Sequence, residues 1–244
     1  MKIATWNLQR VLPHSPKALL QRQWLDRINA DIWILTETNP EISPGPDYHS
    51  LLSQPSAAAD QQQELWIQLW VRNPPITPIV TRNPATSVCG LVRLEREQSC
   101  LIYGMVLPLP ENPYPDVAHE RSFMEALRGN QADWKQLQAT YPEAMLIVAG
   151  DFNQDLNVLP YYGSRRNKQA LRQALAEANL DCLTFGDNDP VRRLIDGQHS
   201  NIDHICIAHS EVINLQRTFA WPHSLEDLRG ISEHFGVGLE FFPA

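Results

Sequence analysis

The sequence predicts an α/β fold in which a two-layer β-core is covered by helices. Three observations support this prediction. Short apolar runs of strand length recur along the chain, longer helix-like segments lie between them, and no internal repeat, low-complexity tail or linker interrupts the pattern. The chain has 244 residues, of which 43% are hydrophobic, and this is enough for a large core. We therefore expect a single domain over residues 1–244.

The N-terminal half begins with a strand, a helix and a second strand. Lys2–Asn7 is predicted to be a strand, and Asp31–Thr36 is a short apolar run typical of a buried strand. Ser15–Asn29 is helix-like, with Ser15 as a candidate N-cap and Pro16 at the first helical position. The other segments expected in this half are a polar loop, four strands and a Pro-rich loop, at Ile42–Glu64, Leu65–Val71, Ile76–Thr81, Ser87–Leu94, Cys100–Leu107 and Pro108–Pro115.

The C-terminal half continues the same alternation. Helices are predicted over Val117–Tyr141 and Asn167–Ala178. The expected strands are Ala144–Ala149, Asp181–Thr184, Ile202–Ala208, Val212–Ala220 and Phe235–Phe241. Because the strands are many and the helices few, the helices are expected to cover the outer faces of a sheet core.

Charge and cysteine content disfavour two classes of protein. The formal charge is −8 and the pI about 5.4, which argues against a protein that coats nucleic acid by counterion release. Such a chain can still hold a few phosphates locally through a metal ion. The four cysteines, Cys89, Cys100, Cys182 and Cys206, are widely spaced and form no CxxC pair. Free thiols are therefore expected, and a zinc site is not.

The sequence also predicts the cellular compartment of the protein. Met1-Lys2 leads directly into a strand-like run, without the apolar segment of a signal peptide. No apolar run approaches the roughly 18 residues of a membrane span. We therefore expect a cytoplasmic protein with reduced thiols and no transmembrane segment, and we expect it to be a monomer.

Two polar residues follow predicted strands in the N-terminal half. Asn7 ends the first strand, and taken alone such a residue is more often a turn or cap residue than a ligand. Glu37 leaves the apolar run Asp31–Thr36, and a carboxylate is rarely carried to such a place unpaired. For Glu37 a metal ligand and a surface residue that caps the next loop are equally good interpretations.

Gly150-Asp151-Phe152-Asn153 gives a sharper signal. The apolar run Ala144–Ala149 ends abruptly there in Gly and two polar residues. The spacing of Asp151 and Asn153 puts both side chains on one side of an extended backbone. An Asx turn is the alternative, because Asp and Asn favour such turns. A turn does not need both residues, so the pattern favours a functional pair.

Histidines and carboxylates near the C-terminus complete the set. Asp203 and His204 lie in a predicted strand, whose alternation lets one of them face inward. His234 follows Glu233 just before the last strand. A lone histidine is usually a surface or satisfied residue, but beside an Asp of a neighbouring strand it can form a catalytic dyad. Carboxylates, amides and imidazole without Cys suit a hard cation and a phosphate ester, so metal-assisted phosphate hydrolysis is expected.

Five motifs together resemble the endonuclease/exonuclease/phosphatase superfamily. In chain order they are Thr5-Trp6-Asn7, Thr36-Glu37-Thr38, Gly150-Asp151-Phe152-Asn153, Ile202-Asp203-His204 and Ser232-Glu233-His234-Phe235. The resemblance implies a four-layer α/β/β/α sandwich of two packed, mainly antiparallel sheets flanked by helices. It also implies a phosphoric ester hydrolase, either a nuclease or a phosphatase, that uses in-line attack of water and depends on Mg²⁺, with Mn²⁺ as the alternative metal.

The resemblance assigns metal-binding roles residue by residue. Asn7 and Glu37 match the residues that hold the divalent cation, with Glu37 the principal ligand. Glu233 stands where the superfamily usually has Asp, as in Ser-Asp-His. Its extra methylene moves the carboxylate, so two interpretations stay open. Glu233 either completes the metal shell, directly or through a water, or points away from it.

The resemblance also assigns the catalytic roles. Asp151 and Asn153 match the pair that positions the attacking water and contacts the scissile phosphate, and Asp203 matches the acid that orients His234. The superfamily usually carries a phosphate-contacting His or Tyr after the strand that precedes the long helix. This chain has neither there, and the candidates to replace it are Tyr103, Tyr114 and His119.

The motifs do not define the substrate. The charge of −8 and the lack of a Lys/Arg run disfavour a duplex-specific nuclease. Short or single-stranded nucleic acid, a nucleotide, a lipid phosphate and a sugar phosphate stay open. A second interpretation is a catalytically weakened member that acts as a binding module, which the Glu233 substitution and the missing His/Tyr support. The intact catalytic residues argue against it.

Overall fold

The computed structural model describes residues 1–55, 65–94, 98–108, 123–157, 162–209 and 213–243. The strands of the first sheet are β1 (Lys2–Asn7), β2 (Ile32–Thr38), β3 (Tyr48–Leu52), β4 (Leu65–Arg72), β11 (Ile213–Trp221) and β12 (Gly236–Pro243). Those of the second sheet are β5 (Ile76–Ile79), β6 (Ser87–Arg93), β7 (Ser99–Val106), β8 (Ala144–Asp151), β9 (Leu180–Cys182) and β10 (Asp203–Ala208). The helices are α1 (Pro16–Ile28), α2 (Phe123–Thr140), α3 (Arg165–Glu177), α4 (Pro190–Ile195), α5 (Leu225–Arg229) and the 3₁₀-helix η2 (Gly186–Asn188).

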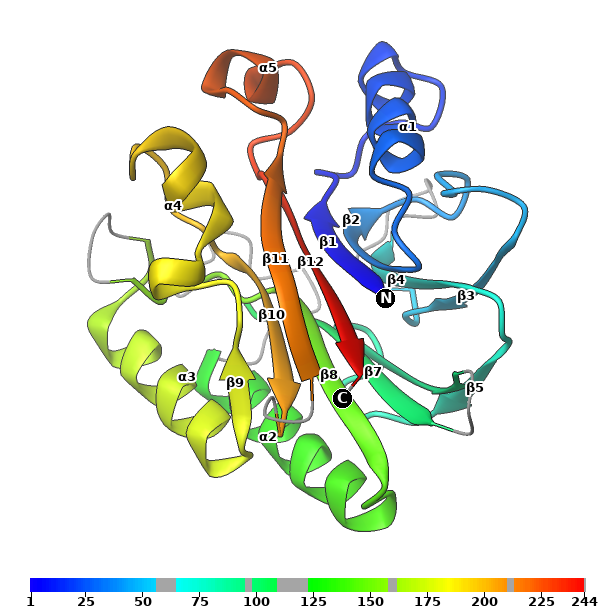
Figure 1. Cartoon of the computed structure of the whole chain (residues 1–244), viewed down its shortest axis with the longest axis vertical. Helices are drawn as coiled ribbons and strands as arrows, with labels where there is room; N and C mark the ends of the chain where they lie inside the picture. The colour runs from blue at the N-terminus through cyan, green and yellow to red at the C-terminus, as the bar shows by residue number, and fades with distance from the viewer. Residues whose placement is uncertain (56–64, 95–97, 109–122, 158–161, 210–212, 244) are drawn as a thin grey trace.

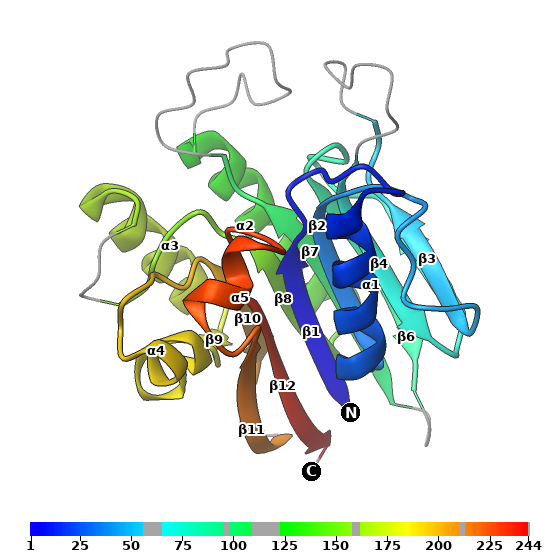
Figure 2. The same cartoon turned by 90° about the horizontal axis from the view of Figure 1, so that it is seen from above.

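The two sheets pack face to face and helices cover their outer faces (Figure 1). Strand order is β11-β12-β1-β2-β4-β3 in one sheet and β5-β6-β7-β8-β10-β9 in the other. Figure 2 shows α1 on one side of the sheets and α2 and α3 on the opposite side. The predicted α/β/β/α sandwich of mainly antiparallel sheets is confirmed.

Each sheet contains one parallel pair among the strands described. β1 runs parallel to β2, and β7 runs parallel to β8, while the other neighbours are antiparallel. A helix connects each parallel pair, α1 in the first and α2 in the second. Polar residues that follow parallel strands therefore gather at one edge of the sandwich, where ligands bind in α/β folds.

Apolar layers hold the sandwich together. Fully buried Ile34, Ile102 and Ile147 belong to the cluster between the two sheets. Trp134 of α2 packs on the outer face of the second sheet, and Leu25 of α1 packs on that of the first. Strands buried on both faces read as continuous apolar runs, which is why β2 and β8 are recognisable from the sequence.

Local signals explain the confirmed start of α1. The Ser15 hydroxyl accepts a hydrogen bond from the Ala18 N–H at 3.1 Å, and Pro16 occupies the first turn. Asn29 ends the helix in the left-handed conformation with φ 50°. The predicted N-cap and both helix boundaries are thus explained by the residue types at those positions.

Four of the described elements differ from the prediction. β3 lies inside the segment Ile42–Glu64 that was predicted to be a loop, because this short edge strand has only half-buried and exposed residues and lacks a buried apolar run. The short helices α4 and α5 and the 3₁₀-helix η2 were not predicted. The segments 56–64 and 109–122, and so parts of the predicted loops and of helix Val117–Tyr141, lie outside the described residues. Within the described part of the chain, no helix is both long enough and apolar enough to cross a bilayer.

Candidate functional site

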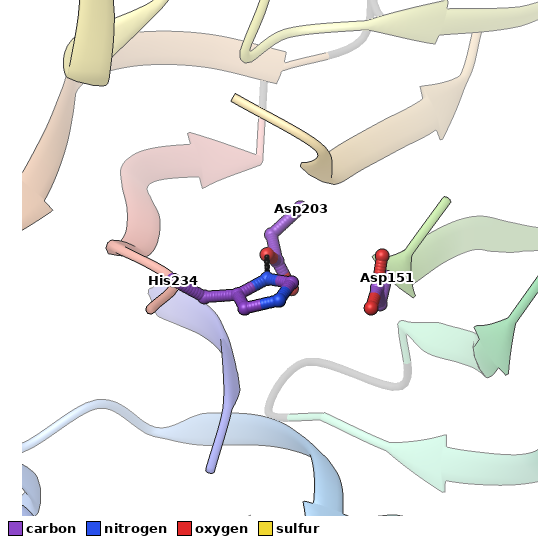
Figure 3. A group of neighbouring side chains, drawn as sticks. All are labelled: Asp151, Asp203 and His234. Carbon is purple, nitrogen blue, oxygen red and sulfur yellow. Dashed lines mark hydrogen bonds and ion pairs between the residues drawn. The ribbon is translucent and has the colours of Figure 1, made fainter. Parts of the chain in front are cut away.

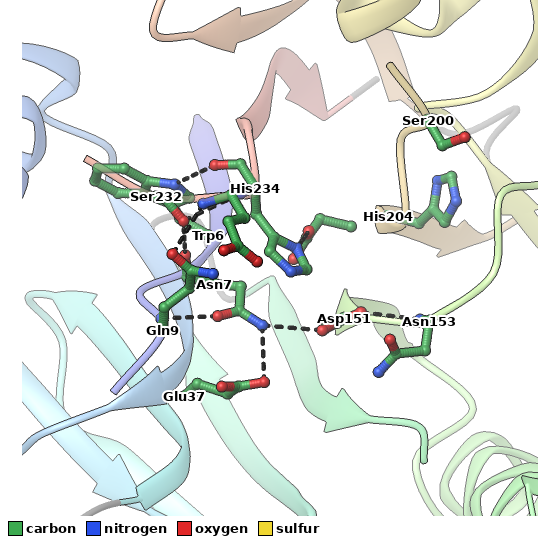
Figure 4. Close-up of polar contacts among 12 residues, drawn as sticks. Trp6, Asn7, Gln9, Glu37, Asp151, Asn153, Ser200, His204, Ser232 and His234 are labelled. Atoms are coloured by element: carbon green, nitrogen blue, oxygen red, sulfur yellow. Dashed lines mark hydrogen bonds and ion pairs between the residues drawn. The ribbon is translucent and has the colours of Figure 1, made fainter. Parts of the chain in front are cut away.

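The predicted site residues meet at one edge of the sandwich (Figure 4). Asn7 and Glu37 lie at the carboxyl ends of the parallel strands β1 and β2, and Asp151 ends β8. Asp203 opens β10 and pairs directly with Asp151 across the antiparallel ladder. His234 precedes β12, which runs antiparallel to β1. Five residues that are far apart in the sequence thus reach one place.

Asn7 links the two sheets at this edge. Its Nδ2 donates to Glu37 Oε1 at 3.2 Å and to Asp151 Oδ2 at 3.0 Å. Its Oδ1 accepts from the Gln9 N–H at 2.9 Å. The side chain is buried, so Asn7 is more than a turn residue. It sets the positions of two carboxylates relative to each other.

Glu37 is held by a second partner and by its backbone. The Arg10 Nε lies 3.2 Å from Glu37 Oε2, and the Arg10 guanidinium stacks over the Trp66 ring at 4.2 Å from its centroid. Glu37 and Arg10 both adopt positive φ values, 45° and 52°. Such conformations cost energy in residues other than glycine and cluster at functional sites. Only its position shortly after the Asn7 motif distinguishes Arg10 in the sequence.

Gly150 explains how the chain presents Asp151. Its φ is 135°, and a Cβ there would lie 2.0 Å from the Met105 carbonyl oxygen of β7. Only glycine allows this close parallel pairing. The Asn153 N–H donates to Asp151 Oδ1 at 2.9 Å, and Asn153 Nδ2 donates to the Leu107 carbonyl at 2.7 Å. An Asx turn is therefore present, and it leaves Asp151 Oδ2 directed at Asn7.

The buried Asp203 and the half-buried His234 form a pair (Figure 3). His234 Nδ1 lies 2.6 Å from Asp203 Oδ2, and Asp203 is 2% exposed. The His234 backbone is fixed on both sides, since its carbonyl accepts from Trp6 Nε1 at 2.9 Å and its N–H donates to Ser232 Oγ at 3.1 Å. The ring is thus held in a single orientation toward the site.

The charge of Asp203 shifts the pKa values of His234 and Asp151. Burial disfavours the charged imidazole of His234, but the Asp203 carboxylate outweighs burial and raises the His234 pKa to about 9. Burial, and then the charge of Asp203, raises the Asp151 pKa to about 7. At neutral pH His234 is therefore charged, while Asp151 holds a proton far more readily than an ordinary carboxyl.

The acidic groups suit a hard cation. One ligand atom each of Asp151, Asp203 and His234 lies within 4.8 Å of the other two. The buried Asp203 Oδ1 makes no hydrogen bond to any described residue. The carboxylates of Asp151, Asp203 and Glu37 gather acidic charge here that a divalent cation such as Mg²⁺ or Mn²⁺ would offset, and after burial the charges of Asp203 and Glu37 raise the Asp151 pKa.

Four further positions were predicted in or near the site, namely Glu233, Tyr103, Tyr114 and His119. Glu233 is exposed, and its backbone N–H donates to Gln9 Oε1 at 2.9 Å, so it lies at the rim of the site. Tyr103 as a phosphate-contacting residue is wrong, because its buried hydroxyl lies 3.0 Å from Asp133 Oδ2 under α2. The other candidates, Tyr114 and His119, lie outside the described residues.

Strand alternation separates Asp203 from its neighbour. His204 is fully buried, with Nδ1 3.3 Å from Thr184 Oγ1 and Nε2 3.1 Å from the Gln154 carbonyl. It therefore packs beside Phe152, with ring centroids 5.4 Å apart, and takes no part in the dyad. The prediction that one member of the pair faces the site is confirmed for Asp203.

A cleft of about 380 Å³ opens beside the dyad. Asp203, Glu233 and His234 form one wall of it, and Tyr162 and His199 also line it. Neither Tyr162 nor His199 belongs to a motif of the sequence. Only the fold shows that they line the cleft.

No protein-family model and no curated protein matches the sequence. Solved structures do match its fold along nearly the whole chain. The 3′ phosphatase NExo from Neisseria, bound to a product DNA hairpin, aligns with TM-score 0.68 and 17% identity over 99% of both chains. The human Nocturnin catalytic domain with bound sulfate aligns with TM-score 0.67 and 13% identity, over 100% of this chain and 93% of that one.

A third match carries the superfamily name. The endonuclease/exonuclease/phosphatase from Beutenbergia cavernae aligns with TM-score 0.65 and 15% identity, over 100% of this chain and 72% of that one. The chain therefore has the endonuclease/exonuclease/phosphatase fold, as the resemblance implied. Identities of this size establish the fold and leave the reaction to be argued from the site.

Proposed function

We propose that this protein is a divalent-metal-dependent phosphoesterase that hydrolyses a phosphodiester or phosphomonoester by in-line attack of water. One observation carries the proposal. Asp151, whose pKa is raised to about 7, hydrogen-bonds Asn7 and lies beside the Asp203–His234 pair. A carboxylate poised near neutral pH next to a fixed imidazolium is what the hydrolysis of a phosphate ester requires.

Asn7, Glu37 and Glu233 are the residues proposed to hold the metal ion. Glu37 offers a carboxylate at the end of β2. Asn7 on the adjacent strand would offer Oδ1, which here accepts from the Gln9 N–H, and Glu233 at the rim would act through a water. Bound Mg²⁺, or Mn²⁺, would supply Lewis-acid polarisation of the phosphate oxygens.

Asp151 and Asn153 are proposed to prepare the attack. Asp151 accepts a proton from the water or orients it, and a pKa near the working pH makes it effective as a general base. Asn153 is held by the Leu107 carbonyl in a left-handed turn with φ 49°, which fixes its side chain beside Asp151. From there it is proposed to contact the scissile phosphate.

Asp203 and His234 are proposed to stabilise the charge that develops on the phosphate. The Asp203 carboxylate keeps His234 protonated and binds its Nδ1. The other ring nitrogen, Nε2, is then proposed to face the phosphate. A preorganised charge in a buried site costs no reorganisation during the reaction. Asp203 is thus a positioning residue, and His234 makes the contact.

A binding module is the second candidate, and Arg10 favours it. Its guanidinium already pairs with Glu37 and is fixed by stacking on Trp66, so it competes with a cation for that carboxylate. A protein of this kind would hold a phosphate-bearing ligand without turnover. Short or single-stranded nucleic acid, a nucleotide, and a lipid or sugar phosphate are the proposed ligands or substrates, and a cytoplasmic monomer stays the expectation.

Hydrolysis of bis-p-nitrophenyl phosphate separates the two candidates. The purified protein is assayed with Mg²⁺, with Mn²⁺ and after EDTA treatment. A phosphoesterase releases p-nitrophenol with either metal, loses the activity in EDTA and regains it when Mg²⁺ is restored. Absence of turnover with every metal, together with measurable phosphate binding, would support the binding module instead.

A further inference from the structure

The cleft beside the dyad is a pocket of substrate size. Its volume of about 380 Å³ lies near the lower end of the range of roughly 300–1,000 Å³ for small-molecule sites. Asp203 and His234 form one end of it. A phosphate held at the dyad would therefore place the organic group next to the phosphate inside this cleft.

The charge of the cleft selects against further phosphates. Among the described lining residues there is no Lys or Arg, the charge of Asp203 is balanced by the His234 imidazolium paired with it, and Glu233 adds a further carboxylate. Burial raises the pKa of Tyr162, and the charges of Asp151 and Glu37 raise it further, so the Tyr162 hydroxyl lies in a negative field. A group that enters the cleft beyond the scissile phosphate is therefore not an anion.

The walls of the cleft offer flat aromatic surfaces and hydrogen-bonding groups together. The His199 ring meets Phe235 edge-on, with centroids 5.4 Å apart and planes at 76°. Tyr162 is 36% exposed and so presents its ring to a ligand. Gln198 brings an amide group to the same cleft, whereas the buried Asn201 already donates its Nδ2 to the Thr184 carbonyl at 3.0 Å. Aromatic faces stack on planar rings, and amides bond to ring edges.

We propose that this cleft binds the nucleobase of a substrate that carries one nucleoside next to the scissile phosphate. A nucleobase is planar and uncharged and has donors and acceptors along its edges, so it uses every feature of the cleft. A quaternary ammonium group would leave the Gln198 amide without a partner, and the further phosphates of a polyphosphorylated sugar would meet the Glu233 carboxylate with no Lys or Arg among the described lining residues. The assignment rests on the proposed function, since it places the scissile phosphate at the dyad.

Equilibrium binding tests the proposal without requiring turnover. Titration calorimetry in Mg²⁺ compares thymidine 5′-monophosphate, inorganic phosphate and phosphocholine as ligands of the wild-type protein. We expect the nucleotide to bind tightest of the three. His199→Ala and Tyr162→Ala should each weaken nucleotide binding by about 5- to 100-fold, the range for loss of one base-stacking partner, and should leave phosphate binding unchanged. His49→Ala, the same change at an exposed position on the edge strand β3, is the matched control.

The possible outcomes separate this inference from the function on which it rests. Nucleotide binding that both cleft variants weaken, with no hydrolysis of any ester, supports the cleft and contradicts the phosphoesterase. Hydrolysis of bis-p-nitrophenyl phosphate with equal affinity for nucleotide and phosphate contradicts the cleft alone. Tighter binding of phosphocholine, no nucleotide binding, or cleft variants that match the wild type in nucleotide affinity would each overturn the proposal.

Discussion

Asp203→Asn removes the charge that keeps His234 protonated, and its effect on stability should depend on pH. The pKa of His234 is about 9 against an ordinary value of 6.5. Since one pKa unit corresponds to about 1.36 kcal/mol, the charged pair contributes roughly 3 kcal/mol to folding. Asn keeps the size of the side chain but cannot hold the imidazolium. Burial then dominates, and the His234 pKa should fall to 6.5 or below.

The direction of the pH dependence follows from the raised pKa. A histidine whose pKa is higher in the folded state stabilises the protein fully below pH 6.5, and this contribution is lost as the pH rises through about 9. Asp203→Asn should therefore destabilise the metal-free protein by roughly 3 kcal/mol at pH 6 and by much less at pH 10. Loss of the Asp203 charge should also lower the pKa of Asp151, because that charge raises it in the wild type. Ionised Asp151 then costs less free energy in the folded state, and this further reduces the destabilisation above pH 7.

Two assays on the EDTA-treated protein measure these effects. Urea denaturation at pH 6 and pH 10 gives the free energies of unfolding, and NMR titration of the His234 ring gives its pKa directly. Asp187→Asn, at an exposed carboxylate, serves as the control and should change neither quantity. An equal destabilisation at both pH values, or a His234 pKa that does not move in the Asn variant, would refute the electrostatic account of the pair.

Substitutions at three further positions test other parts of the site. Glu37→Gln should weaken Mg²⁺ binding at least tenfold in calorimetry with an unchanged circular dichroism spectrum, and equal Mg²⁺ affinity would remove Glu37 from the metal site. Glu233→Asp should preserve or raise activity and Glu233→Ala should lower it, whereas a silent Glu233→Ala would show that this side chain points away. Gly150→Ala should lower the free energy of unfolding by more than about 1 kcal/mol in urea, because the new Cβ would lie 2.0 Å from the Met105 carbonyl oxygen. A stability equal to wild type would contradict that geometry.

The sequence revealed the parts of the site that interrupt apolar runs. Asn7, Glu37 and Asp151 each follow a strand buried on both faces, so their polarity stands out against the run. Each lies where it was expected, because parallel strands joined by α1 and α2 end at the same edge. The pairing of Asp203 with His234 was also predictable, since an imidazole near a buried carboxylate gains a strong partner.

The sequence did not reveal residues whose role depends on contacts distant in the chain. Gln9 accepts from the Glu233 N–H across more than 200 positions, and Arg10 pairs with Glu37 where both residues adopt left-handed backbone conformations. The edge strand β3 was missed because its polar residues face solvent. Tyr103 was considered near the site, but strand alternation turns its ring to the outer face beneath α2.

The turnover rate of Asp151→Asn relative to wild type tests the central claim most directly. With saturating Mg²⁺ and bis-p-nitrophenyl phosphate, wild type should turn over, and the variant should lose at least about 100-fold in kcat, because Asn cannot accept the proton of the attacking water. Circular dichroism should show the same fold for both proteins. A variant that hydrolyses the ester as fast as wild type, or a wild type without Mg²⁺-dependent hydrolysis, would contradict the assignment of this site as a phosphoesterase.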